Sequence, residues 1–375
     1  MKKIIILLVI LFNLSCTKSE PSEESSNCIF EGDIILKSQD DVNEFIKHNY
    51  CTIKGSLTIG NDDSITKSDI YNISGLLSLN DITNNLIISQ NPNLISLEGL
   101  ENLKQIGGSL TLGQNSSLQS LNKLISLNKI RYELFIYLNN SLVNLKGLEK
   151  IALLQNVRIN ENQNLINLEG FENLENINSM YVDGNQSLTS LKGLNNLKYT
   201  SYVNIGSNKS LTNLKDLSNL NSNKGDVSID IYKNPSLISL TGLEGLTKIY
   251  SVNLRENQSL NSLDGLENIT SINNLWISYN PELITLTELK NVLSIGNSEN
   301  SQIDIHHNSN LISLKGLENV ISFKGNIWIM DNVKLRTLCP IQQILSNGTY
   351  KSVNILYNFY NPTVNQIISG NNCSI

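Results

Sequence analysis

Aliphatic residues recur along this chain in one repeated pattern. Residues 91–115 are NPNLISLEGLENLKQIGGSLTLGQN, in which Leu or Ile stands at nearly every third position. The segment ends on a predicted strand of the form Leu-x-Leu/Ile-x-x-Asn, and the closing Asn returns every 23 to 28 residues through most of the chain. A period of this length predicts a solenoid in which each repeat forms one coil stacked on the last.

The closing Asn marks eleven consecutive coils: Asn91, Asn115, Asn139, Asn162, Asn185, Asn208, Asn234, Asn257, Asn280, Asn308 and Asn332. Asp62 takes this position in the coil before them and Asn358 in the coil after, so we expect about thirteen coils. An Asn amide at a tight corner can bond the backbone of its own turn and of the adjacent coil. The pattern therefore predicts a ladder of stacked amides, and Asp62, which only accepts when ionised, suits an end position.

The aliphatic positions predict which side chains fill the interior. In one coil these are Leu94, Leu97, Leu100, Leu103, Ile106, Leu110 and Leu112. A coil of 23 to 24 residues encloses a narrow space that such side chains fill without leaving a polar atom unsatisfied.

Two positions in each predicted strand point outward, because side chains alternate between the two faces of a sheet. The first positions are Thr58, Ile87, Thr111, Phe135, Arg158, Tyr181, Asn204, Asp230, Asn253, Trp276, Asp304, Trp328 and Asn354. The second positions are Gly60, Ser89, Gly113, Tyr137, Asn160, Asp183, Gly206, Tyr232, Arg255, Ser278, His306, Met330 and Leu356. Both Trp residues of the chain are in the first set, two coils apart.

Aromatic side chains beside Arg on an exposed strand face have the composition of an interaction hot spot. We predict a binding face at Trp276 and Trp328, with Tyr232, Arg255, His306 and Met330 as their neighbours. A second candidate cluster is Phe135, Tyr137, Arg158 and Tyr181. The alternative is that aromatics stand here only because they favour exposed strands.

The N-terminus predicts export. A basic start at Lys2 and Lys3 precedes an apolar run over residues 4–12, which is too short to span a bilayer and indicates a signal peptide over 1–15. Ser15 before Cys16 resembles the lipobox of bacterial lipoproteins, although Asn13 stands where that motif has Leu. The resemblance implies that Cys16 is lipidated after cleavage. The alternative is an ordinary signal peptide followed by a chance Cys.

Residues 16–27 comprise Cys16 and a polar tether, TKSEPSEESSN, which we expect to be disordered. Cleavage after residue 15 leaves 26 Lys and Arg against 34 Asp and Glu, a net charge of −8. This balance favours neither a nucleic-acid partner nor electrostatic binding to anionic lipid. The lipobox resemblance implies an outer-membrane lipoprotein on the surface of a bacterial envelope, and the charge leaves its lipid anchor as the expected contact with the membrane.

The remaining Cys residues lie in pairs at the two ends of the repeats. We expect the disulfides Cys28–Cys51 and Cys339–Cys373, because the solenoid separates the two pairs; a zinc site is the rival interpretation, but neither pair has metal-ligand spacing. An N-terminal cap over 28–56 is predicted to hold a strand over 30–36 and a helix capped by Ser38. The solenoid then spans 57–338. A C-terminal cap over 339–375 would hold the last strand and short helices near 340–345 and 362–369.

The repeats resemble leucine-rich repeats. The N-terminal segments EGDIILKSQDDVNEF and CTIKGSLTIG, with NPxLxSLxGLxxLxxIxGxLxIxxN, are similar to the receptor L domain family over residues 28–375. The resemblance implies an all-β, right-handed parallel β-solenoid and ligand binding as a class of function. The array is longer than the family's lobes, and no cysteine-rich module interrupts it, so a signalling role is not implied.

Catalysis finds little support in the sequence. His306 and His307 are adjacent, and neighbouring strand residues point to opposite faces, which makes them poor joint metal ligands. Asp230 and Asp304 lie three coils apart, about 14 Å, too far for a pair of catalytic carboxylates. We expect no cofactor and a monomeric protein that binds an extracellular protein or glycan. The alternatives are a structural spacer of the envelope and, less favoured, a glycan-active enzyme.

Overall fold

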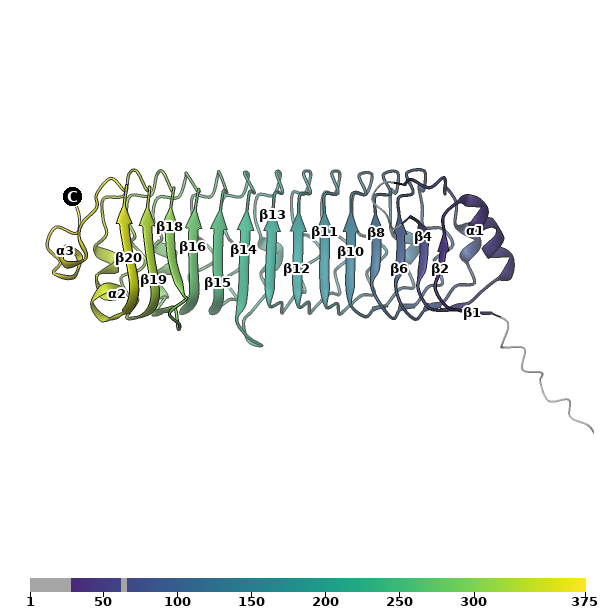
Figure 1. Cartoon of the computed structure of the whole chain (residues 1–375), viewed down its shortest axis with the longest axis horizontal. Helices are drawn as coiled ribbons and strands as arrows, with labels where there is room; N and C mark the ends of the chain where they lie inside the picture. Colours follow the sequence, from purple (N-terminus) through teal and green to yellow (C-terminus); the bar gives the residue numbers. More distant parts are fainter. Residues whose placement is uncertain (1–27, 62–65) are drawn as a thin grey trace, which may run out of the picture.

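The computed structural model describes residues 28–61 and 66–375 of the chain. They form a straight rod of stacked coils, with one long parallel sheet along a whole side and with the first described coil and the C-terminus at opposite ends of the rod (Figure 1). At a spacing of about 4.8 Å between strands, the sheet is about 60 Å long. The predicted all-β parallel solenoid is confirmed.

The long sheet has 15 strands, which pair parallel with their neighbours. In order along the rod they are β2 (Ile34–Leu36), β4 (Leu57–Gly60), β6 (Leu86–Ser89), β8 (Leu110–Gly113), β10 (Glu133–Tyr137), β11 (Asn156–Asn160), β12 (Ser179–Asp183), β13 (Tyr202–Gly206), β14 (Val227–Tyr232), β15 (Lys248–Arg255), β16 (Ser271–Ser278), β18 (Gln302–His306), β19 (Ser322–Met330) and β20 (Thr349–Leu356). The short β17 (Ser294–Ile295) bridges the first residues of β16 and β19.

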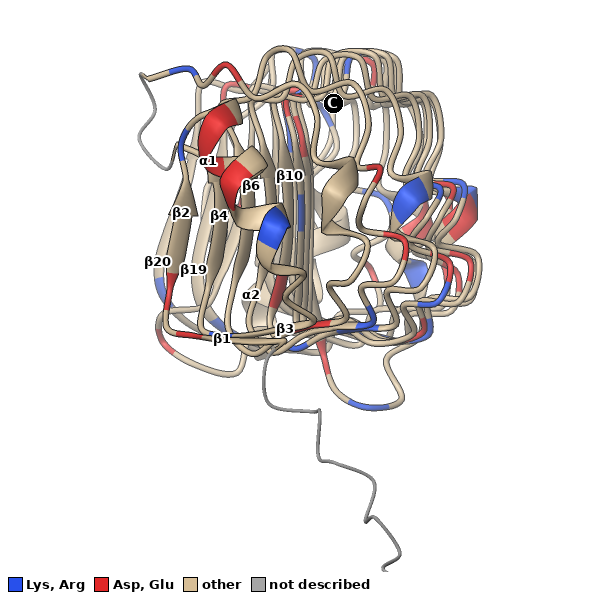
Figure 2. Ribbon diagram, turned by 90° about the vertical axis from the view of Figure 1, so that its right-hand side faces the viewer, with Lys and Arg blue, Asp and Glu red and all other residues tan. Residues whose placement is uncertain are grey.

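A second, shorter sheet lies on the adjoining wall of the first coils (Figure 2). It contains β1 (Ile29–Glu31), β3 (Thr52–Lys54), β5 (Asp81–Ile82), β7 (Gln105–Ile106) and β9 (Lys129–Ile130). The single strand predicted over 30–36 is wrong, because Gly32 adopts φ 106° and breaks it into β1 and β2, which join different sheets. Ile35 pairs with Thr58, so β2 adds a strand to the thirteen that we expected.

The interior is a continuous aliphatic core. All seven residues predicted to point inward in the coil from Leu94 to Leu112 are fully buried. The same holds in nearly every coil, where Leu, Ile and Val fill the space between the strands and the opposite turns. The spacing of aliphatic residues therefore fixed the interior, because a coil this narrow leaves each such side chain only one direction to point.

The predicted ladder of Asn side chains is present. Asn208 is fully buried, and its Nδ2 donates to the carbonyl of Val182 at 2.8 Å, in the preceding coil. Its Oδ1 accepts from the backbone N–H of Asn185 at 3.1 Å, while its own N–H donates to Asn234 Oδ1 at 3.0 Å. The pattern repeats from Asn91 to Asn358, where Asn361 Oδ1 takes the place of the next coil. The predicted end position, Asp62, lies outside the described residues.

The ladder forces the residue before each Asn into the left-handed region of backbone conformation. Leu138, Lys233 and Tyr279 have φ values of 55°, 54° and 56°. Such values cost about 1 kcal/mol or more for residues other than glycine. The chain adopts them in one coil after another because the turn aims each Asn amide into the stack.

Both ends of the solenoid are capped. The N-terminal helix α1 (Gln39–Phe45) begins at Ser38, whose side chain forms a capping box with Asp41, as predicted. At the other end, α2 (Gln342–Asn347) and α3 (Val364–Ile368) occupy the predicted helical segments. The structure also pairs the cysteines as expected, Cys28 with Cys51 and Cys339 with Cys373. The signal peptide, Cys16 and the tether fall in residues 1–27, outside the described residues.

The wall opposite the long sheet carries much of the charge (Figure 2). Its turns contain the repeated Gly-Leu-Glu, in which Gly has a positive φ and its N–H donates to the Glu carboxylate two residues later. In the coil of Gly170, where Phe171 takes the place of Leu, Glu172 accepts the same bond at 2.9 Å. The acidic residues of this wall therefore serve first to close turns.

We expect Asn208→Ala to lower the free energy of unfolding by about 2–4 kcal/mol, because the Val182 carbonyl and the Asn185 N–H lose their buried partner. Equilibrium urea denaturation of the full chain would measure it. Asn223→Ala, at an exposed loop position, is the matched control and should change stability by less than about 0.5 kcal/mol. Equal costs for the two substitutions would contradict the role given to the ladder.

Candidate binding face

Two files of outward side chains run along the long sheet, and we call them row A and row B. Row A contains the first outward residue of each strand and row B the second, as predicted from the sequence. The strand register confirms both files: Trp276 pairs with Asp304 and Asp304 with Trp328, while Ser278, His306 and Met330 pair in the same strands. The two Trp residues therefore lie two strands apart, about 10 Å, on one face.

Trp276, Asp304 and Trp328 form the centre of this face. All three side chains are partly exposed. The indole N–H of Trp276 donates to Gln302 Oε1 at 2.8 Å, which holds the ring toward β18. Asp304 lies in row A between the two rings, and its buried Oδ1 has no hydrogen-bond partner among the described residues. Burial raises the pKa of the Asp304 carboxyl, and the nearby His306 opposes that shift.

His306 and Met330 lie beside this centre in row B. Burial lowers the pKa of His306, against the pull of the Asp304 charge, and its Nδ1 finds no partner in the described part of the chain. His307 stands just past the end of β18 with φ 56°, and its ring lies 5.3 Å from that of His306. The expectation that the two rings point to opposite faces was wrong, because His307 belongs to the turn.

These histidines nevertheless form no recognisable metal site. The ring of His307 stacks on Tyr279 with 4.5 Å between centroids, and its Nε2 is 3.9 Å from Asp331. Within residues 28–61 and 66–375, no group of three His, Cys, Asp or Glu side chains is placed to hold a metal ion.

Tyr232 and Arg255 belong to a separate cluster. The Tyr232 hydroxyl donates to Asp183 Oδ1 at 3.0 Å, so its ring lies back across Gly206 and away from the Trp pair. The Arg255 guanidinium stacks 4.6 Å above that ring, and its Nη2 is 3.6 Å from Asp230 Oδ2. The two side chains therefore contact each other and the Asp residues rather than the Trp pair, although Arg255 lies on β15, the strand next to Trp276. A Cβ at Gly206 would meet the tyrosine ring at 2.2 Å, which explains glycine there.

Asp230 was not among the predicted site residues, yet its carboxylate has defined hydrogen-bond partners. Its Oδ2 accepts from the Asn204 amide at 3.1 Å and lies 3.4 Å from the Tyr202 hydroxyl. Burial raises the pKa of Asp230, and the charge of Arg255 opposes the shift. The sequence placed Asp230 in row A. It did not predict the contact with Tyr202, because Tyr202 lies one residue before the predicted strand pattern begins.

The predicted N-terminal cluster does come together. Phe135 and Tyr137 stack with 4.5 Å between ring centroids, and the Tyr137 ring covers Gly113 as Tyr232 covers Gly206. The Arg158 guanidinium lies 4.9 Å above the Tyr181 ring, and its Nε is 2.7 Å from Glu133. These aromatics are therefore already partnered by their neighbours within the cluster.

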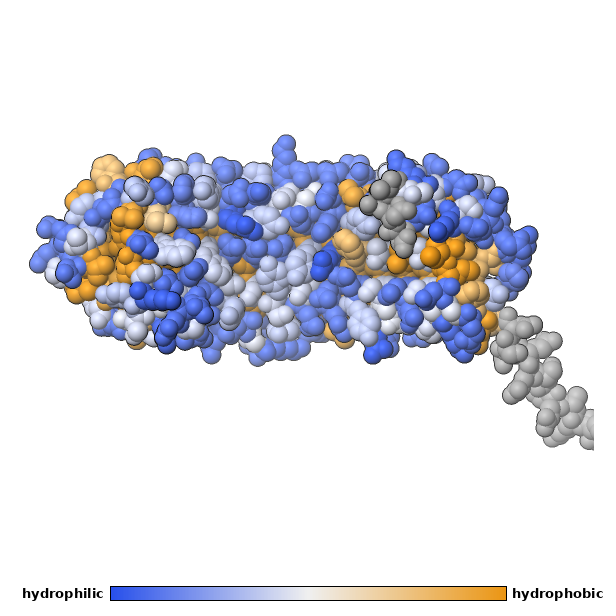
Figure 3. Space-filling model, in the orientation of Figure 1, coloured by the Kyte–Doolittle hydropathy of each residue, from blue (hydrophilic) through white to orange (hydrophobic). Residues whose placement is uncertain are grey.

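Hydrophobic surface on the strand side gathers toward both ends of the rod, while polar residues dominate the middle (Figure 3). At the N-terminal end Ile35 is 46% exposed, and at the C-terminal end Leu356 and Tyr357 are 47% and 72% exposed. Ile35 lies in β2, Leu356 ends β20 and Tyr357 directly follows it, and β2 and β20 are the two outermost strands of the long sheet. They reflect the ends of the stack, where a coil has a neighbour on one side.

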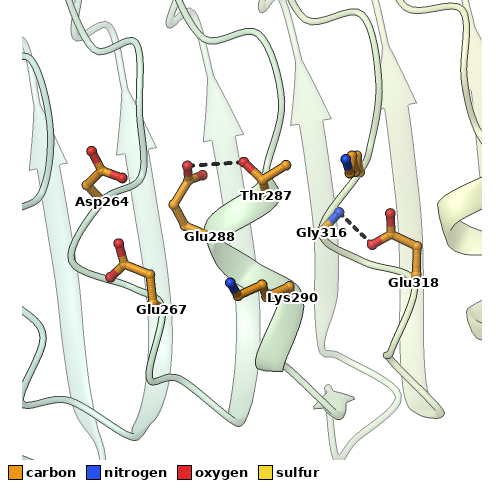
Figure 4. Close-up of a pocket in the computed structure, with 8 residues that line it drawn as sticks. Asp264, Glu267, Thr287, Glu288, Lys290, Gly316 and Glu318 are labelled. Carbon is orange, nitrogen blue, oxygen red and sulfur yellow. Dashed lines mark hydrogen bonds between the residues drawn. The ribbon is translucent and has the colours of Figure 1, made fainter.

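A hollow of about 420 Å³ lies on the opposite wall (Figure 4). It is lined by Asp264, Glu267, Thr287, Glu288, Lys290, Lys315, Gly316 and Glu318. It forms where the turn Thr287–Asn291 replaces the usual Gly-Leu-Glu turn. Glu288 accepts from Thr287 Oγ1 at 3.1 Å, and Glu318 from the Gly316 N–H at 2.7 Å. Glu267 and Glu318 therefore close turns by accepting from a glycine N–H. The hollow was not predicted from the sequence.

Comparisons with known proteins leave the family open. No family model matches the chain, and no curated protein does. Among solved structures, a crystal structure of a TLR13–ssRNA13 complex matches 88% of this chain and 61% of that chain, with 16% identity and a TM-score of 0.21. At that score no function carries over, and the leucine-rich-repeat-like architecture rests on the coils themselves. The described residues contain no helix long and apolar enough to cross a membrane.

We expect Asp304→Asn to raise the melting temperature at pH 7. The folded-state pKa of Asp304 is above its ordinary value, so the ionised carboxylate destabilises the fold above that pKa, and the cost vanishes as protonation becomes complete at low pH. At pH 7 His306 is neutral, because its own pKa is lowered, and cannot offset the charge.

Thermal melts of Asp304→Asn between pH 3 and pH 8 should therefore show a gain that shrinks as the pH falls. Asp264→Asn, at an exposed turn position, is the matched control and should move the melting temperature little at any pH. A gain that is independent of pH would contradict the electrostatic origin.

Proposed function

We propose that this protein is a cell-surface binding protein that presents the strand face of a rigid solenoid to an extracellular protein or glycan, without catalysis. The observation that carries the proposal is the row Trp276–Asp304–Trp328, in which two partly exposed indoles flank a carboxylate in register. Trp is among the residues most enriched in binding hot spots. Here the ladder fixes the backbone beneath both rings, so a partner would meet a surface that needs little ordering.

The arrangement of carboxylates supports binding rather than hydrolysis. Asp230 and Asp304, the two row A carboxylates with raised pKa values, stand three strands apart, about 14 Å. Pairs of glycosidase carboxylates are about 5–10 Å apart. A structural spacer without a ligand is the second candidate function, and the capped, unbranched rod favours it. The two functions differ in that a binding protein has a partner whose binding the Trp variants weaken, whereas a spacer has none.

The proposal includes attachment to the outer membrane of a bacterial envelope through a lipid on Cys16. Its support is the sequence alone: the apolar run over residues 4–12, Ser15 before Cys16, and the polar tether before the first coil. An anchor of this kind would leave the rod outside the membrane and free to present either face. The strand face and the anchor are independent parts of the proposal.

We expect Trp276→Ala and Trp328→Ala each to raise the dissociation constant for the partner about thirtyfold. This corresponds to a loss of about 2 kcal/mol of binding free energy, as for a hot-spot residue. Screening the full chain against glycans and extracellular proteins, with Trp fluorescence as the readout, identifies the partner. Tyr71→Ala, an aromatic 62% exposed away from rows A and B, is the matched control and should bind normally. Unchanged binding in both Trp variants would place the site elsewhere.

We expect Cys16→Ser to move the protein from the membrane fraction to the soluble fraction of the cell, because the lipid needs the Cys16 thiol. Metabolic labelling with a fatty-acid analogue should mark the wild-type chain and leave Cys16→Ser unlabelled. Cys339→Ser, at the far end of the solenoid, is the control and should keep the label. Labelling that persists in Cys16→Ser would overturn the anchor and leave the binding face untouched.

A further inference from the structure

The aromatic residues of row A have a regular spacing along the rod. They are Phe135, Tyr181, Trp276 and Trp328, on β10, β12, β16 and β19. Counted in paired strands, the steps between them are two, four and two, so every step is a multiple of two strands. One step of two strands is about 10 Å. A single charged residue, Arg158 or Asp304, fills the strand between the members of each close pair.

We propose that the partner of the strand face is a linear β-1,4-linked glycan that lies along row A, across the strands, with alternate sugars stacked on Trp276 and Trp328. The inference rests on the proposed function and specifies its ligand. In a β-1,4-linked chain each sugar is turned by half a rotation from the one before. The same face therefore recurs at every second sugar, with a repeat close to the two-strand spacing. The apolar C–H face of a pyranose suits the flat face of an indole.

The residues between and beside the two rings suit the rest of such a chain. A sugar bridging the Trp pair would lie over Asp304, whose carboxylate accepts hydrogen bonds from hydroxyls and forms stronger ones than a neutral acceptor. The hydrogen bond from Trp276 to Gln302 already orients one ring, so stacking costs little side-chain entropy. Ser278, on the same strand as Trp276, adds a hydroxyl in row B.

A protein partner fits this surface less well. An extended peptide binds a sheet by pairing with a free strand edge, yet β16, β18 and β19 are each hydrogen-bonded to strands on both sides. A globular partner favours a broad apolar centre with a polar rim. Here the close pairs of row A aromatics stand in single file with one charged residue between their members, and the row B neighbours of the Trp pair are Ser278, His306 and Met330, two of them polar. A narrow polymer matches this file better than a wide surface does.

The test is the dependence of affinity on chain length. A disaccharide reaches one Trp, whereas a trisaccharide reaches both, because its first and third sugars are two positions apart. We expect cello- or chito-oligosaccharides to gain about tenfold in affinity from disaccharide to trisaccharide, which is what one further aromatic contact of about 1.4 kcal/mol provides. Isothermal titration of the full chain measures each constant. Maltotriose, an α-1,4-linked trisaccharide with a curved chain, should show no such gain.

The two Trp variants make the test specific. Trp276→Ala and Trp328→Ala should each abolish the step, leaving the trisaccharide at the affinity of the disaccharide, while Tyr71→Ala keeps it. Circular dichroism confirms that each variant is folded, and Trp328→Phe, which retains a ring, should keep part of the step.

Two outcomes overturn the glycan assignment and spare the proposed function. One is β-linked binding without a length step, or with maltotriose bound equally well. The other is a protein partner lost in the Trp variants while no β-1,4-linked oligosaccharide binds. Absence of any partner for a folded chain, glycan or protein, overturns both the assignment and the proposed function.

Discussion

The hydrogen bonds of the buried Asn side chains hold this structure in register. Each amide joins a carbonyl of the preceding coil to the next Asn, so neighbouring coils cannot slide without leaving several buried groups unsatisfied. The chain accepts a visible cost for this: eleven residues other than glycine that directly precede a ladder Asn have a positive φ, Leu138 and Tyr279 among them. Those conformations persist only because the hydrogen bonds of the stacked Asn side chains offset their cost.

Register in turn creates the proposed binding face. Because every strand stops at the same level, outward residues of successive coils fall into straight rows, and residues 52 positions apart, Trp276 and Trp328, share one line with Asp304 between them. The aliphatic core contributes stiffness and excludes water, but it is almost the same in every coil. What differs from coil to coil is confined to the rows and to the turns, where any specificity must lie.

Neighbours in the rows change the character of individual side chains. Tyr232 and Arg255 would be free contact residues if each stood alone on its strand. In the structure the Tyr232 ring covers Gly206 to reach Asp183, and Arg255 covers the ring. Phe135 and Tyr137 are likewise partnered, because their rings stack on each other and the Tyr137 ring covers Gly113. Trp276 and Trp328 keep exposed ring surface because the residue between them, Asp304, is short and has no ring to stack on either.

The sequence by itself determined the coils, the inward residues from Leu94 to Leu112, the ladder, the caps and the cysteine pairs, because each depends on spacing within a repeat or on position at an end. It also placed every residue in its row. Only the tertiary structure decided where side chains lean: Tyr232 toward Asp183, Trp276 toward Gln302, and His307 onto Tyr279. Those directions depend on residues that lie a coil or more away in sequence but within a few ångströms in space, and a repeat pattern holds no information on such pairs.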